Sequence, residues 1–140
     1  MRSRCELPEV PVLLGGCHGV GVDLVDLGEF TQIMERRPRL LERVFTENEL
    51  AYCRERHQPM QHLAARFAAK EAAFKAIGTG WAHGVTWHDA EVASRPGAAP
   101  ELIARGELAR RARELGAQRF HLSLSHSGGY AAAIVVLGDR

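Results

Sequence analysis

The chain has 140 residues, 46% of them hydrophobic and 25% charged, which is typical of one globular domain with its own core. Its 18 basic and 17 acidic side chains leave a net charge of +1, so bulk charge indicates neither nucleic acid nor a membrane surface as a partner. No apolar run approaches the roughly 20 residues of a membrane helix. Three widely spaced cysteines indicate neither a zinc site nor a disulfide framework. We therefore expect a cytoplasmic protein with reduced thiols and no nucleic-acid or membrane partner.

The first expected element is a strand over residues 18–27, which follows an N-terminal extension over residues 1–17. The strand reads HGVGVDLVDL, and its valines favour a buried position in a sheet. Gly19 and Gly21 indicate that another backbone packs closely against it. Asp23 is costly to bury in so apolar a strand unless it is paired, binds a metal or lies at the strand's exit. A cap for the next turn is an equally good interpretation of this aspartate.

Helical segments are expected next. Residues 29–43 have a helical pattern that Pro38 breaks. Thr46 and Glu49 form the sequence signature of a capping box at the start of another helix. A longer helix is expected over residues 61–77, before the glycine-rich sequence GTG.

The sequence of the second half of the chain predicts three strands and one helix. A strand is expected over residues 84–94, a loop over 95–100 and a basic-faced helix over 101–116. Two further strand-like runs, 119–127 and 130–138, are joined by Ser-Gly-Gly and predict a hairpin.

The helix over residues 61–77 carries charge where its core-facing residues belong. At about 100° per residue, its large apolar side chains form one stripe, with Lys70 in the middle and Glu71 at the edge. A surface interpretation is available, since Glu71 and Lys75 have the spacing of a helix ion pair, and Arg66 and Lys70 could extend to water. A ligand site is the alternative, because the glycines of GTG allow a phosphate to approach the backbone.

Two other polar groups are weaker candidates. The strand HLSLSHS places His121, Ser123 and Ser125 on one face with His126 at its end, which fits a solvated face or a rim that binds a ligand. No GxSxG turn accompanies these residues, so a serine hydrolase is not indicated. The arginines over residues 105–113 have two acidic neighbours, Glu107 and Glu114, which favours a solvated helix face over an RNA-binding one.

Three stretches together resemble the holo-acyl-carrier-protein synthase family, the small class of 4′-phosphopantetheinyl transferases. They read GVGVDLVDL, LAARFAAKEAAFKAIGTG and FHLSLSHSGGYAAAIVV, in the family's order and at its spacing over roughly residues 18–138. The resemblance implies an α+β fold in one domain, residues 18–140, with an antiparallel sheet and packed helices. It also implies a homotrimer with active sites between subunits.

The activity implied is the Mg²⁺-dependent transfer of 4′-phosphopantetheine from coenzyme A to a serine of an apo acyl carrier protein, with release of 3′,5′-ADP. The family's metal-binding aspartate and glutamate correspond to Asp23 and Glu71, and two carboxylates suit magnesium, which completes its shell with phosphate and water. Lys75, one turn beyond Glu71, is placed for the diphosphate. The proton acceptor for the carrier serine stays open between Glu71 and a metal-bound water.

The remaining coenzyme contacts are also implied by the resemblance. Arg66 and Lys70 would serve other phosphate groups, and the backbone of the GTG sequence would pass close to the nucleotide. The last strand would contact the nucleotide through its polar side chains. The residues concerned are Arg66, Lys70, Lys75, Gly78, Thr79, Gly80, Ser123, Ser125 and His126.

The chain departs from the family at three places. Gly28 and Glu29 stand where the family carries basic residues that receive the acidic carrier. The sequence PGAAP replaces a Gly-Lys-Pro-like turn, and the N-terminal extension is longer than the family's usual start. None of these touches the metal ligands, so we expect activity, with carrier choice open between fatty-acid, polyketide and other carriers. A non-catalytic coenzyme A-binding module of the same fold is the alternative function.

Overall fold

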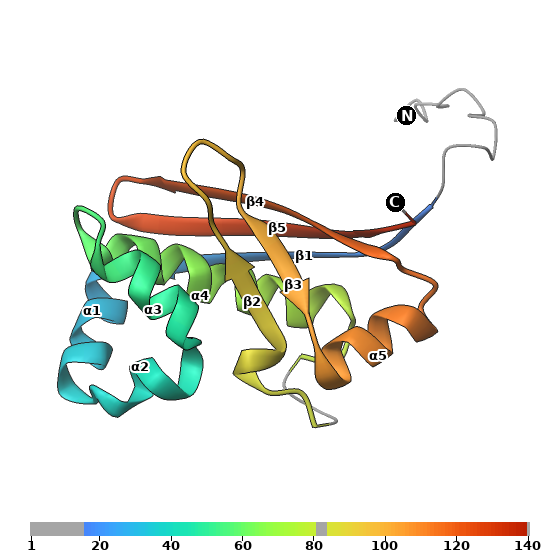
Figure 1. Cartoon of the computed structure of the whole chain (residues 1–140), viewed down its shortest axis with the longest axis horizontal. Helices are drawn as coiled ribbons and strands as arrows, with labels where there is room; N and C mark the ends of the chain where they lie inside the picture. The colour runs from blue at the N-terminus through green and yellow to red at the C-terminus, as the bar shows by residue number, and fades with distance from the viewer. Residues whose placement is uncertain (1–15, 81–83, 140) are drawn as a thin grey trace, which may run out of the picture.

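The computed structural model describes residues 16–80 and 84–139. Its main sheet is antiparallel with the strand order β1-β5-β4, and a separate two-stranded antiparallel sheet pairs β2 with β3. Figure 1 shows the β2–β3 hairpin beside β4. The strands are β1 (Cys17–Asp26), β2 (Ala90–Ala93), β3 (Glu101–Ala104), β4 (Arg119–Ser127) and β5 (Tyr130–Gly138).

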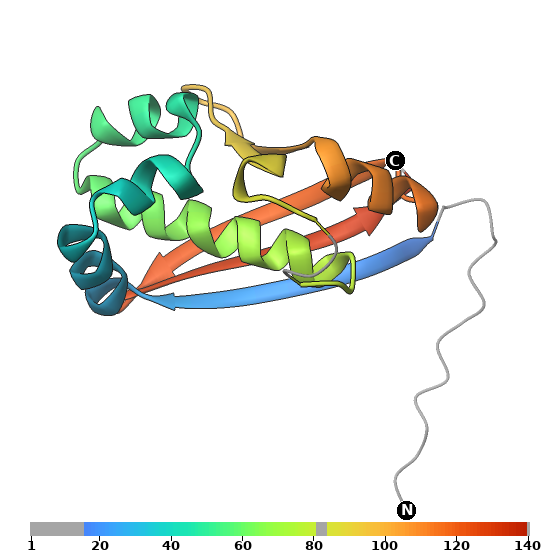
Figure 2. The same ribbon diagram turned by 90° about the horizontal axis from the view of Figure 1, so that it is seen from below.

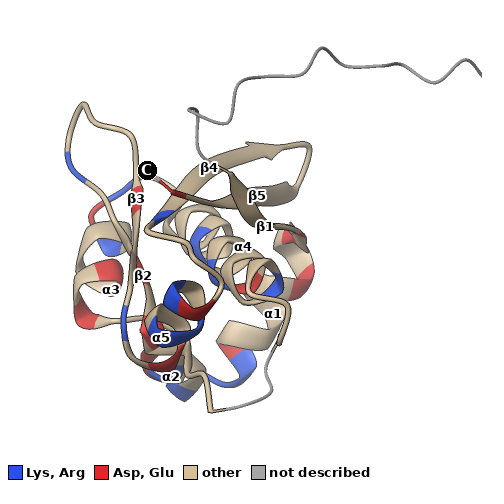
Figure 3. Cartoon of the chain, turned by 90° about the vertical axis from the view of Figure 1, so that its right-hand side faces the viewer, with Lys and Arg blue, Asp and Glu red and all other residues tan. Residues whose placement is uncertain are grey.

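The helices all lie on one side of the main sheet (Figures 2 and 3). The longest, α4, runs along β1 and β5, and α1 and α3 pack against it. The helices are α1 (Leu27–Arg36), α2 (Arg39–Val44), α3 (Glu47–Arg54), α4 (Pro59–Ala76), the 3-10 helix η2 (Trp87–Asp89) and α5 (Gly106–Glu114). The α+β expectation, with antiparallel sheets and packed helices, is confirmed.

Small residues let α4 lie unusually close to β1. A Cβ atom added at Gly21 would lie 1.9 Å from the carbonyl oxygen of Ala72, and one added at Gly19 would lie 2.1 Å from that of Ala76. No real Cβ atom fits at such distances, so both glycines are required for this contact. The buried alanines of α4 provide the matching flat surface. The close packing inferred from the two glycines is thus confirmed.

Several local predictions are confirmed. Pro38 separates α1 from α2, and Thr46 caps α3 in a complete capping box with Glu49. The helix expected over residues 61–77 is α4, which begins two residues earlier. The expected hairpin joins β4 to β5.

Two predicted boundaries are wrong. The strand expected over residues 84–94 is a turn of η2 followed by the four residues of β2. The helix expected over residues 101–116 begins only at Gly106, because residues 101–104 form β3. Strand β3 is fixed by its pairing with β2, which local periodicity does not reveal.

The face of the main sheet opposite the helices is uncovered, and its β1 and β5 part is apolar, so the burial expected for Val20 and Val22 is not found within the described part of this chain. Val20, Val22 and Leu24 of β1 are 59%, 62% and 64% exposed, and Tyr130 and Ile134 of β5 are exposed as well. Few charged residues lie on this sheet (Figure 3), since β1, β4 and β5 carry only three: Asp23, Asp26 and Arg119.

The other sequence expectations have mixed outcomes. Residues 1–15 of the expected extension lie outside the described residues, and Cys17 already belongs to β1. Cys17 and Cys53 are free thiols. On α5, Arg110 pairs with Glu107 and Glu114, as a solvated helix face would. Among the described residues, no helix is long and apolar enough to span a membrane.

Candidate active site

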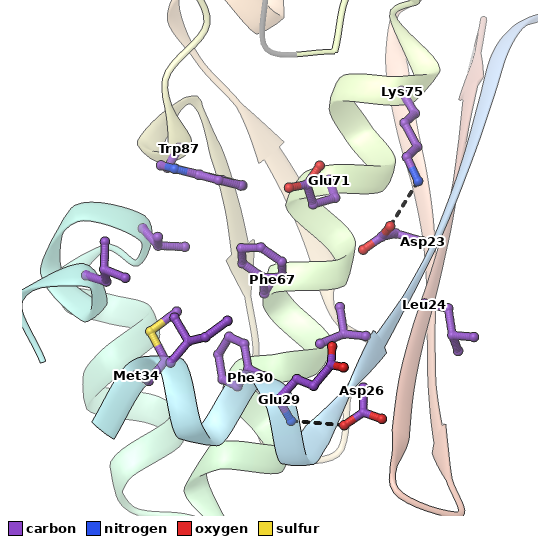
Figure 4. A pocket seen from close by; sticks show the side chains of 14 residues that line it. Asp23, Leu24, Asp26, Glu29, Phe30, Met34, Phe67, Glu71, Lys75 and Trp87 are labelled. Atoms are coloured by element: carbon purple, nitrogen blue, oxygen red, sulfur yellow. Dashed lines mark hydrogen bonds and ion pairs between the residues drawn. The ribbon is translucent and has the colours of Figure 1, made fainter. Parts of the chain in front are cut away.

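A cavity of about 520 Å³ opens between β1, α1, α4 and η2. Carboxylates and a lysine lie on its β1 and α4 side, and aromatic and aliphatic side chains form the rest of its wall (Figure 4). The lining residues used below are Asp23, Asp26, Glu29, Phe30, Met34, Phe67, Glu71, Lys75 and Trp87.

Asp23 and Lys75 form an ion pair at this cavity. The Lys75 ammonium donates hydrogen bonds to Oδ1 of Asp23, at 2.9 Å, and to the carbonyl of Val22, at 3.0 Å. The lysine side chain is 51% exposed and the aspartate side chain 17% exposed. Because the pair meets solvent, an incoming anion or cation can compete for either partner.

Glu71 lies on the same side of α4 as Lys75, one turn earlier, and its side chain points into the cavity beside Phe67 and Trp87 (Figure 4). The close contact that Gly19 and Gly21 allow brings β1 against this part of α4. Two segments almost 50 residues apart thus place Asp23, Glu71 and Lys75 in one cavity.

Two further carboxylates lie at the cavity, and sequence reasoning gave neither of them a place in it. Asp26 caps α1, its Oδ1 accepting a hydrogen bond from the backbone N–H of Glu29 at 2.9 Å. The capping role first considered for Asp23 therefore belongs to Asp26, three residues further along. Glu29 lies in the first turn of α1 and is exposed.

The apolar wall was also missed. Phe30 and Met34, one turn apart on α1, face α4, and the Phe67 ring lies 5.6 Å from that of Phe30 and 5.2 Å from that of Trp87. The spacing of Phe30 and Met34 is the helical signal that could have indicated it. Trp87 gave no such signal, because it lies in a short helix that the sequence did not predict.

The structure corrects the expectation that Lys70 extends to water or to a phosphate. Its side chain is 0% exposed, and its ammonium lies 2.7 Å from a carboxylate oxygen of Glu49, also 0% exposed. Burial lowers the pKa of Lys70, and the Glu49 carboxylate opposes that fall. The sequence placed Lys70 correctly in the packing stripe, and its charge is tolerated there because Glu49 neutralises it.

Arg66 is also buried and points away from the cavity. Its guanidinium donates to the carbonyl of His62 at 3.0 Å and to the hydroxyl of Ser94 at 2.5 Å, and it lies over the Tyr52 ring. Its Nε has no hydrogen-bond partner among the described residues. Arg66 therefore does not line the cavity, and its charge is held by contacts within the protein.

The polar residues Ser123, Ser125 and His126 of β4 do not line this cavity. Ser123 and Ser125 are exposed on the uncovered face of the sheet, and His126 is hydrogen-bonded to Gln61 at the start of α4, at 2.9 Å. The pKa of His62 is lowered by burial and then by the nearby charges of Arg66 and His126. His62, Arg66 and His126 thus make up a second polar region beside the first half of α4, the Arg66–His126 cluster, while Ser123 and Ser125 lie on the opposite face of the sheet.

The GTG sequence follows directly after α4. Gly78 and Gly80 have φ angles of +79° and +55°, in the left-handed region that favours glycine, and Thr79 lies between them. Added Cβ atoms at either glycine would meet nothing within 4 Å, so the turn's conformation, not crowding, requires glycine. GTG does not line the cavity described above.

Carboxylates and a lysine together decide which ligands the cavity can hold. Among residues 16–80 and 84–139, no three histidine, cysteine, aspartate or glutamate side chains are grouped to hold a metal. Asp23 and Glu71 are two carboxylates, and magnesium commonly takes one or two from a protein and the rest of its shell from phosphate and water. The donor set therefore fits Mg²⁺ in company with a phosphorylated ligand.

Comparison with known proteins decides the family. The family model of the 4′-phosphopantetheinyl transferase superfamily matches residues 19–135. The chain belongs to this superfamily. A holo-[acyl-carrier-protein] synthase of Koribacter versatilis is 47% identical over 122 residues, which cover 86% of this chain and 98% of the relative.

Solved structures agree with this assignment. A holo-[acyl-carrier-protein] synthase from Neisseria meningitidis has a TM-score of 0.79 at 29% identity, with 89% of this chain and 100% of that one covered. The enzyme from Bacillus anthracis, solved in complex with CoA (3′,5′-ADP), has a TM-score of 0.73 at 33% identity, with 89% and 98% covered. The resemblance inferred from the three sequence stretches is thereby confirmed.

Proposed function

We propose that this transferase moves 4′-phosphopantetheine from coenzyme A to a serine of an apo acyl carrier protein, with Mg²⁺ held by Asp23 and Glu71. The observation that supports these site residues is the convergence of Asp23, Glu71 and Lys75 on one cavity. Membership of the superfamily and the high identity to holo-acyl-carrier-protein synthases make the chain a phosphopantetheinyl transferase.

In the transfer, the carrier serine oxygen forms a bond to the phosphorus that bears pantetheine. The bond from that phosphorus to the bridging oxygen breaks, and 3′,5′-ADP leaves with the bonding electron pair. The serine hydroxyl loses its proton, and either Glu71 or a water in the cavity accepts it. The products are holo carrier protein and 3′,5′-ADP, so the atoms balance.

The residues of this chain bind and orient the reacting diphosphate. When bound between Asp23 and Glu71, Mg²⁺ supplies positive charge against the phosphate oxygens. Lys75 is already at the cavity mouth with its ammonium beside Asp23, so it can contact the diphosphate as well as the aspartate. Such fixed positive groups stabilise charge that develops on a transferring phosphoryl group.

The Arg66–His126 cluster is proposed to bind the nucleotide end of coenzyme A in a site shared between two subunits. Within one chain this cluster does not line the cavity that holds Asp23 and Glu71. Its arginine carries the positive charge that a phosphate requires, and Ser123 and Ser125 are proposed to contact the nucleotide from the exposed face of β4. Gly78, Thr79 and Gly80 are proposed to contact the nucleotide through their backbone. Lys70, which is fully buried, is not part of this proposal.

A homotrimer would bring the two regions together. The uncovered apolar face of the main sheet supports an assembly, since exposed patches of this kind on soluble proteins commonly mark interfaces. Val20→Asp places a charge on that face, and we expect it to give a monomer without transferase activity. Leu115→Asp, a matched charge at an exposed leucine after α5, should leave the assembly and the activity intact. Light scattering that finds a fully active monomer of the unmodified protein would contradict the trimer.

The reaction is tested by incubating the protein with coenzyme A, magnesium and an apo carrier, and by weighing the carrier with mass spectrometry. The expected result is the addition of phosphopantetheine, which stops when magnesium is chelated and returns when it is restored. Binding of coenzyme A without modification of several different carriers would instead support the non-catalytic alternative. Transfer that continues at full rate in chelator would contradict the metal assignment.

A further inference from the structure

The buried pair of Lys70 and Glu49 has no role in the reaction proposed above, yet it lies directly beside the site. Lys70 immediately precedes Glu71 on α4, and neither Lys70 nor Glu49 is exposed at all. The pair must therefore act through the protein groups that surround it.

The ion pair and its hydrogen bonds together connect four elements. The Lys70 ammonium donates to the carbonyls of Trp87, at 3.2 Å, and Ala90, at 2.5 Å. The Glu49 carboxylate accepts from the backbone N–H groups of Thr46 and Val92, each at 2.9 Å. The pair thus joins α3 and α4 to η2 and β2 at a single point.

Stability alone is a weak explanation for such a pair. The loss of hydration on burying two charges largely offsets their attraction, and apolar residues of similar volume often serve equally well. Directed hydrogen bonds differ from apolar packing because they fix where a neighbouring backbone lies. The charges therefore contribute a fixed position for η2, which apolar packing alone would not provide.

Trp87 connects this position to the site. Its carbonyl is held by Lys70, while its indole packs 5.2 Å from the Phe67 ring and 5.6 Å from the Phe74 ring. The same indole forms the cavity wall that faces Glu71 (Figure 4). A displacement of η2 would therefore change the surroundings of the Glu71 carboxylate.

We propose that Lys70, together with Glu49, is a positioning residue that holds Trp87 against the Glu71 side of the cavity. Lys70 touches neither substrate nor metal, and it acts by fixing the wall beside a residue that does. This inference rests on the proposed function, which assigns Glu71 to the reaction.

The test uses Trp87 as its own reporter. Trp81 and Trp87 are the two tryptophans of the chain, so Trp81→Phe leaves Trp87 as the single emitter. In that background, Lys70→Met is compared with Lys70→Met combined with Glu49→Gln, which leaves no buried charge without a partner. The measurements are Trp87 emission and its quenching by acrylamide, the melting temperature, and kcat and KM for coenzyme A at saturating magnesium.

We expect the combined variant to recover melting temperature relative to Lys70→Met, because no unpaired charge is buried. Its Trp87 emission should still shift to longer wavelength and become more accessible to acrylamide. Its kcat should fall about 10- to 100-fold, the usual cost of losing a group that orients an active-site residue. KM for coenzyme A should stay within about twofold, since the coenzyme contacts are untouched.

A matched control separates positioning from general loss of stability. Leu137→Ala removes a fully buried side chain near the end of β5 and lowers the melting temperature without touching η2. Below its melting temperature it should keep the Trp87 emission and kcat of the parent. A fall in kcat equal to that of the combined variant would overturn the proposal.

Other outcomes are equally decisive. The proposal is overturned if the combined variant regains stability together with the parent's kcat, or if its Trp87 emission does not change. If variants at Lys70 do not fold, Glu49→Gln alone is used, because glutamine keeps the shape of the side chain. This variant must show the emission shift and the lower kcat. Trp87 emission and kcat equal to those of the parent would overturn the proposal. A parent protein without transferase activity would contradict the proposed function instead, and the emission measurement would still test the positioning of Trp87.

Discussion

Two lysines on α4, five residues apart, each pair with a carboxylate, and their surroundings differ completely. Lys70 and Glu49 are fully buried and tied to the backbones of two further elements, η2 and β2, whereas Lys75 and Asp23 meet solvent at the mouth of a cavity. Breaking a buried pair leaves a charge without water or partner, but an exposed pair exchanges partners easily. Similar ion pairs on one helix can therefore serve architecture in one case and ligand binding in the other.

The largest expected effect is on the exposed side of this comparison. Asp23→Ala and Glu71→Ala should each abolish transfer while the fold stays intact, because magnesium would lose one of two protein carboxylates. Mass spectrometry of the carrier measures the transfer, and circular dichroism measures the fold. Asp26→Ala is the matched control, since Asp26 lines the same cavity but caps α1. It should cost about 1 kcal/mol of stability and keep activity. Turnover like that of the unmodified protein in either folded variant at Asp23 or Glu71 would show that magnesium is held elsewhere.

The buried pair should show the opposite behaviour. Glu49→Ala leaves the Lys70 ammonium without its carboxylate in the core, and we expect a loss of about 3–5 kcal/mol in the free energy of unfolding. Chemical denaturation measures this loss. Glu47→Ala, an exposed glutamate two residues earlier on α3, is the control and should change stability by less than about 0.5 kcal/mol. Equal stabilities of the two variants would contradict the structural role of the buried pair.

A third prediction concerns the contact that brings Asp23 to Lys75. Gly21→Ala would place a methyl group against the backbone of Ala72, so β1 and α4 must separate, at a cost of about 1–3 kcal/mol for overpacking. Activity should fall as well, because Asp23 moves with β1. Gly28→Ala is the control: its Cβ meets only the Asp26 carboxylate, at 3.3 Å, and in helix α1 alanine should stabilise by up to about 1 kcal/mol. If Gly21→Ala were instead more stable than Gly28→Ala, the close contact between β1 and α4 would not exist.

The smallest effect is expected at Glu29, on the rim of the same cavity. A carrier that is acidic around its serine would be repelled by this exposed carboxylate, so Glu29→Arg should raise kcat/KM, mainly through KM and most clearly at low salt. Four exposed arginines lie nearby on α1, α2 and their connection: Arg36, Arg37, Arg39 and Arg43. We expect their positive charge to keep the unmodified protein active. A salt series on both proteins with one carrier measures the effect. If kcat/KM does not rise at any ionic strength, the carrier does not dock at Glu29.

The sequence predicted the exposed pair's surroundings better than those of the buried pair. Alternation along β1 separated Asp23 from Val20, Val22 and Leu24, and Gly19 and Gly21 correctly indicated a close backbone neighbour. These are local signals, because period and glycine position depend on a few adjacent residues. The candidate site residues Asp23, Glu71 and Lys75 followed from family motifs, and all three line one cavity.

The buried pair could not be predicted in the same way. Helical periodicity placed Lys70 in the core-facing stripe, but its partner Glu49 lies on another helix and was identified only as part of a capping box. Without that long-range contact, a lysine in an apolar stripe is expected to extend to water. Strand β3 was missed for a similar reason, since its pairing with β2 is fixed by tertiary contacts and not by a local pattern.

The most direct test of the contrast between the two pairs compares Lys75→Met with Lys70→Met. The same substitution is thus made at two lysines that lie five residues apart on α4. Stability is measured by chemical denaturation and kcat/KM by transfer to the carrier. Lys75→Met should stay within about 1 kcal/mol of the unmodified protein's stability, while its kcat/KM falls about 100- to 1,000-fold. Lys70→Met should instead lose about 3–5 kcal/mol of stability. A destabilised Lys75→Met variant with full activity, or a Lys70→Met variant of unchanged stability, would contradict this division of roles.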